Sequence, residues 1–334
     1  MATTFILYFL SAAALVFFSI KCADYVDLLD KKTNMSGAFI GGVILAAITS
    51  LPELVTSITA VTPIVNKPEL IAGNVLGSNV FNLCIFGATT VLSVKAFSNA
   101  KIGKSHIATI ICTIVADVLM LATFAIGATN TRIPYIEINA ASFIILVVYF
   151  ISLKFLANDD NENDEEDDSP LTVKQIAIRF VLMAIGLVGM SFLVTYFTDI
   201  IDERLGLGAS LAGAIFLGVV TSLPELASSV TLVRKRNFNA MVGNVVGSNM
   251  FNFTIFSIAD FIAGKKFVYS ENPDAATINM IYFGIISTVL VATSILLQNK
   301  FKKTNPSKGI KLAIYVTLGV AVLASYLVCM VISK

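Results

Sequence analysis

Long apolar stretches alternate with short polar ones along the whole chain. Each stretch holds about 20 mostly apolar residues, the length that an α-helix needs to cross a bilayer. The sequence therefore predicts an all-α integral membrane protein with ten transmembrane helices. We place them at residues 3–21, 37–62, 70–93, 106–128, 137–157, 173–197, 209–233, 241–263, 276–298 and 310–332.

One polar stretch is strongly acidic and of low complexity. Residues 158–169 read NDDNENDEEDDS, and their like charges should keep them extended and solvated. The stretch lacks the spaced glycine and alternation of an EF-hand loop, so a linker is favoured over a Ca²⁺ sensor. We therefore expect three parts, namely a membrane domain at 1–157, a cytoplasmic linker at 158–172 and a second membrane domain at 173–334.

The two halves repeat the same two motifs in the same order. Residues 48–59 (ITSLPELVTSIT) match residues 220–231 (VTSLPELASSVT) at eight of twelve positions. Residues 73–87 (GNVLGSNVFNLCIFG) match residues 243–257 (GNVVGSNMFNFTIFS) at ten of fifteen positions. Such a match at a nearly constant offset indicates an internal repeat.

The basic residues predict how the halves lie in the membrane. Most of the 23 Lys and Arg residues fall in the loops that are cytoplasmic if both termini lie outside the cell. Five crossings in each half is an odd number, so the second half must enter the membrane in the reverse orientation. Two inverted five-helix repeats in a plasma membrane are typical of secondary transporters, whose ion site lies at the midplane between the repeats.

Composition narrows the function class. The chain is 56% hydrophobic and 13% charged, with a mean hydropathy of +0.84, which excludes an ordinary soluble protein. A net charge of +1 without a basic cluster gives no sign of nucleic-acid binding. The four cysteines have no CxxC spacing and are interpreted as reduced packing residues. Neither a cofactor nor an obligate protein partner is indicated, and the lipid bilayer is the expected surroundings.

The first motif places a glutamate, Glu53 or Glu225, inside an apolar stretch. A charge at the bilayer centre costs about 2.5–3.5 kcal/mol on insertion scales, so it points to function. The proline before each glutamate removes a backbone donor and frees carbonyl oxygens one turn earlier. The motif thus gathers carboxylate, hydroxyl and carbonyl oxygens, which are the ligands of a hard cation.

The second motif adds amide and hydroxyl oxygens. Asn74, Ser78 and Asn82 are four residues apart and share one helix face, and Asn244, Ser248 and Asn252 repeat this spacing. Glycines four residues apart, such as Gly243 and Gly247, form a strip of small residues that lets another helix come close.

Charge and residue type narrow the ligand further. Two ionised glutamates are neutralised by one divalent cation or by two or more monovalent cations. The motifs contain no Cys or His, which argues against zinc or copper. Asp117, in the middle of the fourth predicted helix, is a third membrane acid. It is a candidate for a proton relay, and equally for a hydrogen bond to Thr113.

At these residues the chain resembles the calcium/cation antiporter superfamily, and within it the prokaryotic type of sodium/calcium exchanger. The resemblance rests on TSLPE and GNVxGSNxFN in both halves and on ten predicted helices around an acidic loop. It implies exchange of Na⁺ for Ca²⁺ by alternating access, with no enzymatic activity. Two departures from the family pattern are Ile48 and Val220, where the family usually has Gly.

The resemblance also implies roles for individual residues. The two glutamates would bind both Ca²⁺ and Na⁺, with hydroxyl or carbonyl oxygens from the residues that precede them. The serines of the second motif would line Na⁺ sites and the last asparagines would flank the centre. The implied ligands are Glu53, Glu225, Thr49, Ser50, Thr221, Ser222, Ser78, Ser248, Asn82 and Asn252.

Other functions remain open from the sequence. The family's potassium-dependent branch typically ends the second motif with Asp, whereas both halves here have Asn. A Ca²⁺/H⁺ or other divalent cation antiporter is the nearest alternative. A channel would need a continuous pore, and a sensor would bind Ca²⁺ without moving it. The chain has no HExxH motif of a membrane metalloprotease.

Overall fold

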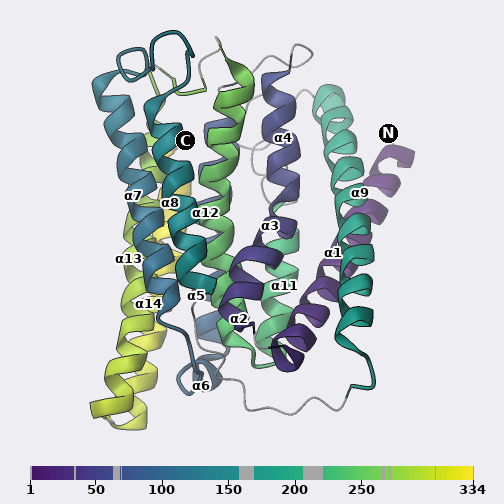
Figure 1. Cartoon of the computed structure of the whole chain (residues 1–334), viewed down its shortest axis with the longest axis vertical. Coiled ribbons are helices and arrows are strands. Elements are labelled where there is room, and N and C mark those ends of the chain that lie inside the picture. Colours follow the sequence, from purple (N-terminus) through teal and green to yellow (C-terminus); the bar gives the residue numbers. More distant parts are fainter. Residues whose placement is uncertain are drawn as a thin grey trace.

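A computed structural model describes residues 2–33, 35–62, 68, 70–157, 169–205, 221–264, 268–270, 272–304 and 306–333. Throughout these residues the secondary structure is helical, apart from one isolated β-bridge between Arg132 and Asn139. Most helices stand roughly side by side along the long axis of the molecule (Figure 1). The acidic stretch 158–168 lies outside the described residues.

Within the described chain, eight helices are long and apolar enough to cross a membrane. A helix pair bent by 43°, Gly37–Thr49 and Leu51–Val61, makes a ninth candidate if the pair is counted as one crossing. The seventh predicted helix, 209–233, is described only from Thr221 onward. The long helices are α1 (Ala2–Lys32), α5 (Leu70–Leu92), α7 (Ser105–Ile126), α8 (Ala140–Ala157), α9 (Val173–Leu205), α12 (Phe238–Ala263), α13 (Ala275–Thr304) and α14 (Lys308–Ile332).

The sequence motifs lie on the bent helix pair, on α11 and on two of the long helices. The bent helix pair consists of α2 (Gly37–Phe39), the π-helical turn η1 (Ile40–Leu45), α3 (Ala46–Thr49) and α4 (Leu51–Val61), and the first motif, residues 48–59, lies on α3 and α4. Its repeat is carried by α11 (Leu223–Arg234), and α6 (Val94–Phe97) follows α5. The second motif of each half lies on α5 and on α12.

Helix α1 is longer than the apolar pattern predicted, since the expected end at residue 21 was wrong and the helix continues to Lys32. Its charged last turns are stabilised by pairing. Asp27 lies 3.3 Å from Lys31 and 3.6 Å from Lys235, and Asp30 accepts a 2.8 Å hydrogen bond from Asn237. Because these partners stabilise the buried carboxylates of Asp27 and Asp30, the helix continues beyond its hydrophobic stretch.

Two apolar clusters pack on either side of a polar layer. On α5, Val80 belongs to one cluster and Leu83 to the other; on α12 the division falls between Met250 and Val246. Both divisions coincide with the polar residues of the second motif, including Asn82. The motifs therefore lie between two apolar cores that limit the access of water.

The glycine strip of α12 allows its backbone to touch η1. A Cβ at Gly247 would lie 2.0 Å from the carbonyl oxygen of Gly42, and one at Gly243 would lie 2.8 Å from the Gly42 nitrogen. The predicted close approach is confirmed for this half. In the first half, a Cβ at Gly73 meets nothing within 4 Å among the described residues, and the repeat places the counterpart of Gly42 at residue 214, outside them.

We expect Gly247→Ala to destabilise the protein, because its methyl group would overlap backbone that cannot move aside. Overpacking typically costs about 1–3 kcal/mol. Thermal unfolding in detergent, followed by loss of monodispersity, measures the effect. Gly189→Ala on α9 is the matched control, since its Cβ would meet nothing within 4 Å. Equal melting temperatures for the two variants would contradict the close contact.

Candidate functional site

Each first motif breaks its helix at a serine. Ser50 separates α3 from α4 with φ −89° and ψ 10°, and Ser222 precedes α11 with φ −91° and ψ 6°. Pro52 and Pro224 occupy the first turn of the helix that follows, where a missing backbone donor is tolerated. The predicted break is confirmed for the first half, and the same serine conformation recurs in the second.

The breaks place two glutamates inside the protein. Glu53 and Glu225 lie in the first turns of α4 and α11, and both are fully buried. Ser50 Oγ donates to Glu225 Oε1 at 3.0 Å, and Ser222 Oγ donates to Glu53 Oε1 at 3.4 Å. Each carboxylate is therefore bound by the serine of the opposite half.

The residues around Glu53 form a connected hydrogen-bond network. Ser78 Oγ donates to Glu53 Oε1 at 3.1 Å and lies 3.4 Å from Ser222 Oγ. Asn252 Nδ2 donates to Ser78 Oγ at 3.2 Å. Thr221 also interacts with the Glu53 carboxylate. Residues from both halves thus surround the first glutamate.

One hydroxyl group from each half donates to the same backbone carbonyl, that of Ala46. Thr49 Oγ1 donates to the carbonyl oxygen of Ala46 at 3.3 Å, and Ser248 Oγ donates to it at 3.5 Å. The Thr49 and Ser248 hydroxyls lie 3.5 Å apart, and Thr49 also interacts with Glu225. Ser248 therefore takes a different partner from its counterpart Ser78.

Two asparagines brace the motifs against each other. Asn74 Nδ2 donates to the carbonyl of Glu53 at 3.1 Å and to Ser57 Oγ at 3.0 Å. Asn244 Nδ2 donates to Ser228 Oγ at 3.0 Å and to the Ser229 hydroxyl at 3.2 Å. The hydroxyl partners were missed by the sequence prediction. The signal was present, because Ser57 and Ser229 occupy equivalent, identical positions of the repeat.

Several buried oxygen atoms of the site make no hydrogen bond in the described part of the chain. They are Glu53 Oε2, Glu225 Oε2, Asn82 Oδ1, Asn249 Oδ1 and Asn252 Oδ1. Buried polar atoms are nearly always paired, so such a set requires an explanation. Carboxylate and amide oxygens are ligands of hard cations such as Ca²⁺. The arrangement fits a cation bound by oxygen.

The donor set is unlike that of a zinc or copper centre. No group of three or more His, Cys, Asp or Glu residues is close enough to hold a metal, as far as the chain is described. The single histidine, His106, is bonded through Nε2 to Asn239 at 2.8 Å. All ten residues named from the sequence are at least 96% buried: Glu53, Glu225, Thr49, Ser50, Thr221, Ser222, Ser78, Ser248, Asn82 and Asn252.

Asp117 lies apart from this network. It is buried on α7, and a Cβ at Gly284 of α13 would be 3.9 Å from its Oδ1 atom. The Thr113 hydroxyl donates to the carbonyl of Thr109 at 3.0 Å. Among the described residues, Asp117 shares no hydrogen bond with Thr113 or with the site.

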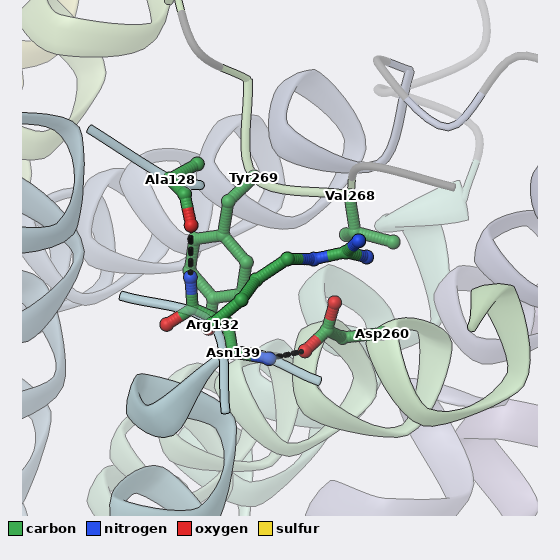
Figure 2. Close-up of a pocket in the computed structure, with 6 residues that line it drawn as sticks. All are labelled: Ala128, Arg132, Asn139, Asp260, Val268 and Tyr269. Carbon is green, nitrogen blue, oxygen red and sulfur yellow. Dashed lines mark hydrogen bonds between the residues drawn. The ribbon is translucent and has the colours of Figure 1, made fainter. Parts of the chain in front are cut away.

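Asp260, at the last turn of α12, joins two loops. Its Oδ2 atom accepts from the backbone of Asn139 at 2.9 Å and from Ser142 Oγ at 2.8 Å. Figure 2 shows the Arg132 side chain beside it, with Tyr269 and Val268 lining the same small pocket. The Arg132 guanidinium donates to the carbonyl of Gly264 at 2.6 Å. These contacts hold the α7–α8 loop against the α12–α13 loop.

Comparison with known proteins shows one consistent family. The family model described as "Sodium/calcium exchanger protein" matches residues 3–157 and 176–334. CaxA of Alkalimonas amylolytica is 29% identical over 238 residues, covering 70% of this chain and 72% of that protein. The inner membrane protein YrbG of Escherichia coli K12 is 24% identical over 246 residues, covering 69% and 70%.

A solved structure has the same fold. The sodium-calcium exchanger NCX_Mj superposes with a TM-score of 0.69 and covers 99% of both chains at 21% identity. At this identity the likeness concerns the fold alone.

We expect Asn74→Ala and Asn244→Ala each to lower stability in detergent, because each removes two buried hydrogen bonds between neighbouring helices. Bonds between membrane helices average about 0.6 kcal/mol each, so a loss of about 1 kcal/mol is expected. The control is Thr59→Ala, whose exposed hydroxyl bonds only the Val55 carbonyl of its own helix. If Asn74→Ala and Thr59→Ala melt alike, the bracing role is wrong.

Proposed function

Because this chain belongs to the sodium/calcium exchanger protein family, we propose that it exchanges Na⁺ for Ca²⁺ by alternating access at the site built by its two motifs. The observation that carries the proposal is the pair of buried glutamates. Each is bonded to the serine of the opposite half, and each has one carboxylate oxygen without a hydrogen bond among the described residues. Two such carboxylates in an apolar interior are stabilised by bound cations.

Charge balance makes the binding of Ca²⁺ and the binding of Na⁺ mutually exclusive. One Ca²⁺ held by Glu53 and Glu225 neutralises both carboxylates, as do two or more Na⁺ on the same oxygens. Hydroxyl and carbonyl oxygens of Thr49, Ser50, Thr221 and Ser222 complete the ligand set. Na⁺ ions also use Ser78 and Ser248, and the amide oxygens of Asn82 and Asn252 flank the centre. Both ions need the same carboxylates, so they compete.

The two halves are proposed to be inverted repeats, 1–157 and 173–334, joined by the cytoplasmic linker 158–172. The equal serine conformations and the reciprocal serine–glutamate bonds support this. In Figure 1, α4 lies in the upper part of the view and α11 in the lower part. The bias of basic residues favours a plasma membrane orientation with both termini outside.

Helices α1 and α9 are the proposed moving elements. They pack against each other, and they also cover the broken helices, α1 against α11 and α9 against α4. Ser19 Oγ of α1 donates to the carbonyl of Pro224 at 2.5 Å, directly at the second break. Movement of this pair along the breaks would open the site to one side and then to the other.

A Ca²⁺/H⁺ antiporter is the second candidate. The observation in its favour is Asp117, a buried acid on α7 that makes no hydrogen bond within the described residues. Coupling to protons would need an acid that exchanges a proton during transport, and Asp117 is the candidate for it outside the two glutamates.

We expect Glu53→Gln and Glu225→Gln each to reduce Na⁺-dependent Ca²⁺ uptake by at least 100-fold, because one carboxylate cannot neutralise Ca²⁺ alone. The measurement uses Na⁺-loaded proteoliposomes and labelled Ca²⁺ in Na⁺-free medium, with and without K⁺.

Glu137→Gln is the matched control for this assay. Its exposed carboxylate lies 3.9 Å from Arg132 at the α7–α8 loop, outside the site, and uptake should be unchanged. Wild-type uptake that does not need internal Na⁺ would refute Na⁺/Ca²⁺ exchange. Full activity in either site variant would refute the assigned site.

Asp117→Asn separates the two candidate functions. Under Na⁺ coupling, the variant should retain Na⁺-dependent uptake and show no uptake driven by a pH gradient alone, as for the wild type. Wild-type uptake that follows the pH gradient without Na⁺, and that is lost in Asp117→Asn, would instead establish proton coupling.

A further inference from the structure

The site contains a pair of asparagines that clasp the two halves together. Asn79 Nδ2 donates to the backbone carbonyl of Asn249 at 3.3 Å, and Asn249 Nδ2 donates to the carbonyl of Asn79 at 3.2 Å. The two residues are equivalent positions of the repeat, 170 residues apart. These reciprocal bonds join α5 to α12 at the polar layer.

A second set of bonds between the halves is formed by Asn252 but not by its counterpart Asn82. Asn252 Nδ2 donates to Asn79 Oδ1 at 2.9 Å and to Ser78 Oγ at 3.2 Å. The repeat predicts the same bonds from Asn82 to Asn249 and Ser248. These bonds are missing from the described chain: neither amide atom of Asn82 has a hydrogen-bond partner there, and neither does Asn249 Oδ1.

The unpaired amide of Asn82 is energetically significant. Asn82 and Asn252 are fully buried, and Asn79 and Asn249 are 5% and 2% exposed. A buried polar group without a partner costs about 1–3 kcal/mol. An arrangement that paired Asn82 with Asn249 would recover this cost and release Asn252 from Asn79. By the symmetry of the repeat, such an arrangement would be chemically equivalent to the observed one.

Asn79 also orients its partner. With both observed bonds made through Nδ2, the Asn252 amide oxygen is left without a hydrogen bond. An amide whose nitrogen is held by acceptors presents its oxygen as a ligand. Asn79 thus fixes the orientation in which the Asn252 amide oxygen would face a cation.

We propose that Asn79 and Asn249 are positioning residues that alternate, Asn79 holding Asn252 when the site faces one side and Asn249 holding Asn82 when it faces the other. This rests on the proposed alternating access between inverted halves. In an inverted repeat, exchanging the conformations of the two halves turns the site toward the opposite face of the membrane. The bond from Asn252 to Asn79, without its counterpart from Asn82 to Asn249, then belongs to one of the two facing states.

The test uses the matched variants Asn79→Ala and Asn249→Ala in oriented proteoliposomes. The half-saturating Ca²⁺ concentration of Na⁺-dependent exchange is measured at each membrane face. Each variant removes one of the two reciprocal bonds between Asn79 and Asn249. A difference between the two variants therefore reports the contact with Asn252 or with Asn82. Depopulating one facing state raises the half-saturating concentration at that face. We expect Asn79→Ala to raise it about three- to tenfold at one face, and Asn249→Ala to do so at the other.

Two further measurements complete the design. The double variant Asn79→Ala/Asn249→Ala should return the ratio between the faces toward the wild-type value. If the alanine variants fail to fold, Asn79→Ser and Asn249→Ser, which replace the amide by a smaller polar group, a hydroxyl, should show the same opposed shifts at smaller size.

The outcomes separate this inference from the proposed function. Shifts in the same direction for both variants, or equal losses at both faces, would show a purely structural clasp and overturn it. If the wild type exchanges Na⁺ for Ca²⁺ but neither variant changes the ratio of the half-saturating Ca²⁺ concentrations at the two faces, the inference is overturned as well. Absence of Na⁺-dependent exchange in the wild type would instead overturn the proposed function on which it rests.

Discussion

The structure depends on keeping two carboxylates in an apolar interior. Glu53 and Glu225 are fully buried, and no basic side chain forms an ion pair with either in the described part of the chain. Neutral hydroxyl groups stabilise them, and amide groups in turn donate to the hydroxyls. Such donors lower the cost of burial without cancelling the charge. A salt bridge would cancel that charge, and the described residues provide none to either glutamate.

Backbone geometry and apolar packing serve this requirement together. The breaks at Ser50 and Ser222 bring each glutamate into the first turn of a new helix, where acidic groups are favoured by the helix dipole. The apolar clusters above and below the polar layer exclude water, which strengthens every electrostatic contact between them. The contact of Gly247 with Gly42 brings η1 and α12 close enough for Ser248 to reach Ala46.

Much of this could be predicted from the sequence. Hydropathy located the long helices, and the duplicated motifs identified the residues that the structure brings together. The charged end of α1 was missed because hydropathy ignores tertiary partners such as Asn237 and Lys235. The clasp of Asn79 with Asn249 was missed because it involves backbone carbonyls of another helix. The unequal bonding of Asn82 and Asn252 could not be predicted, since identical motifs carry no sign of which half adopts which conformation.

The crossed serine–glutamate bonds have a consequence for assembly and ancestry. Since Ser50 bonds Glu225 and Ser222 bonds Glu53, neither half contains a finished centre. The serine that bonds Glu53 lies 169 positions later in the chain. The bonds of the centre can therefore form only after the second half has been synthesised and inserted. A single-motif ancestor would have met the same demand only by pairing with a second copy of itself. In the present chain both copies of the motif are joined, so the same contact forms within one molecule.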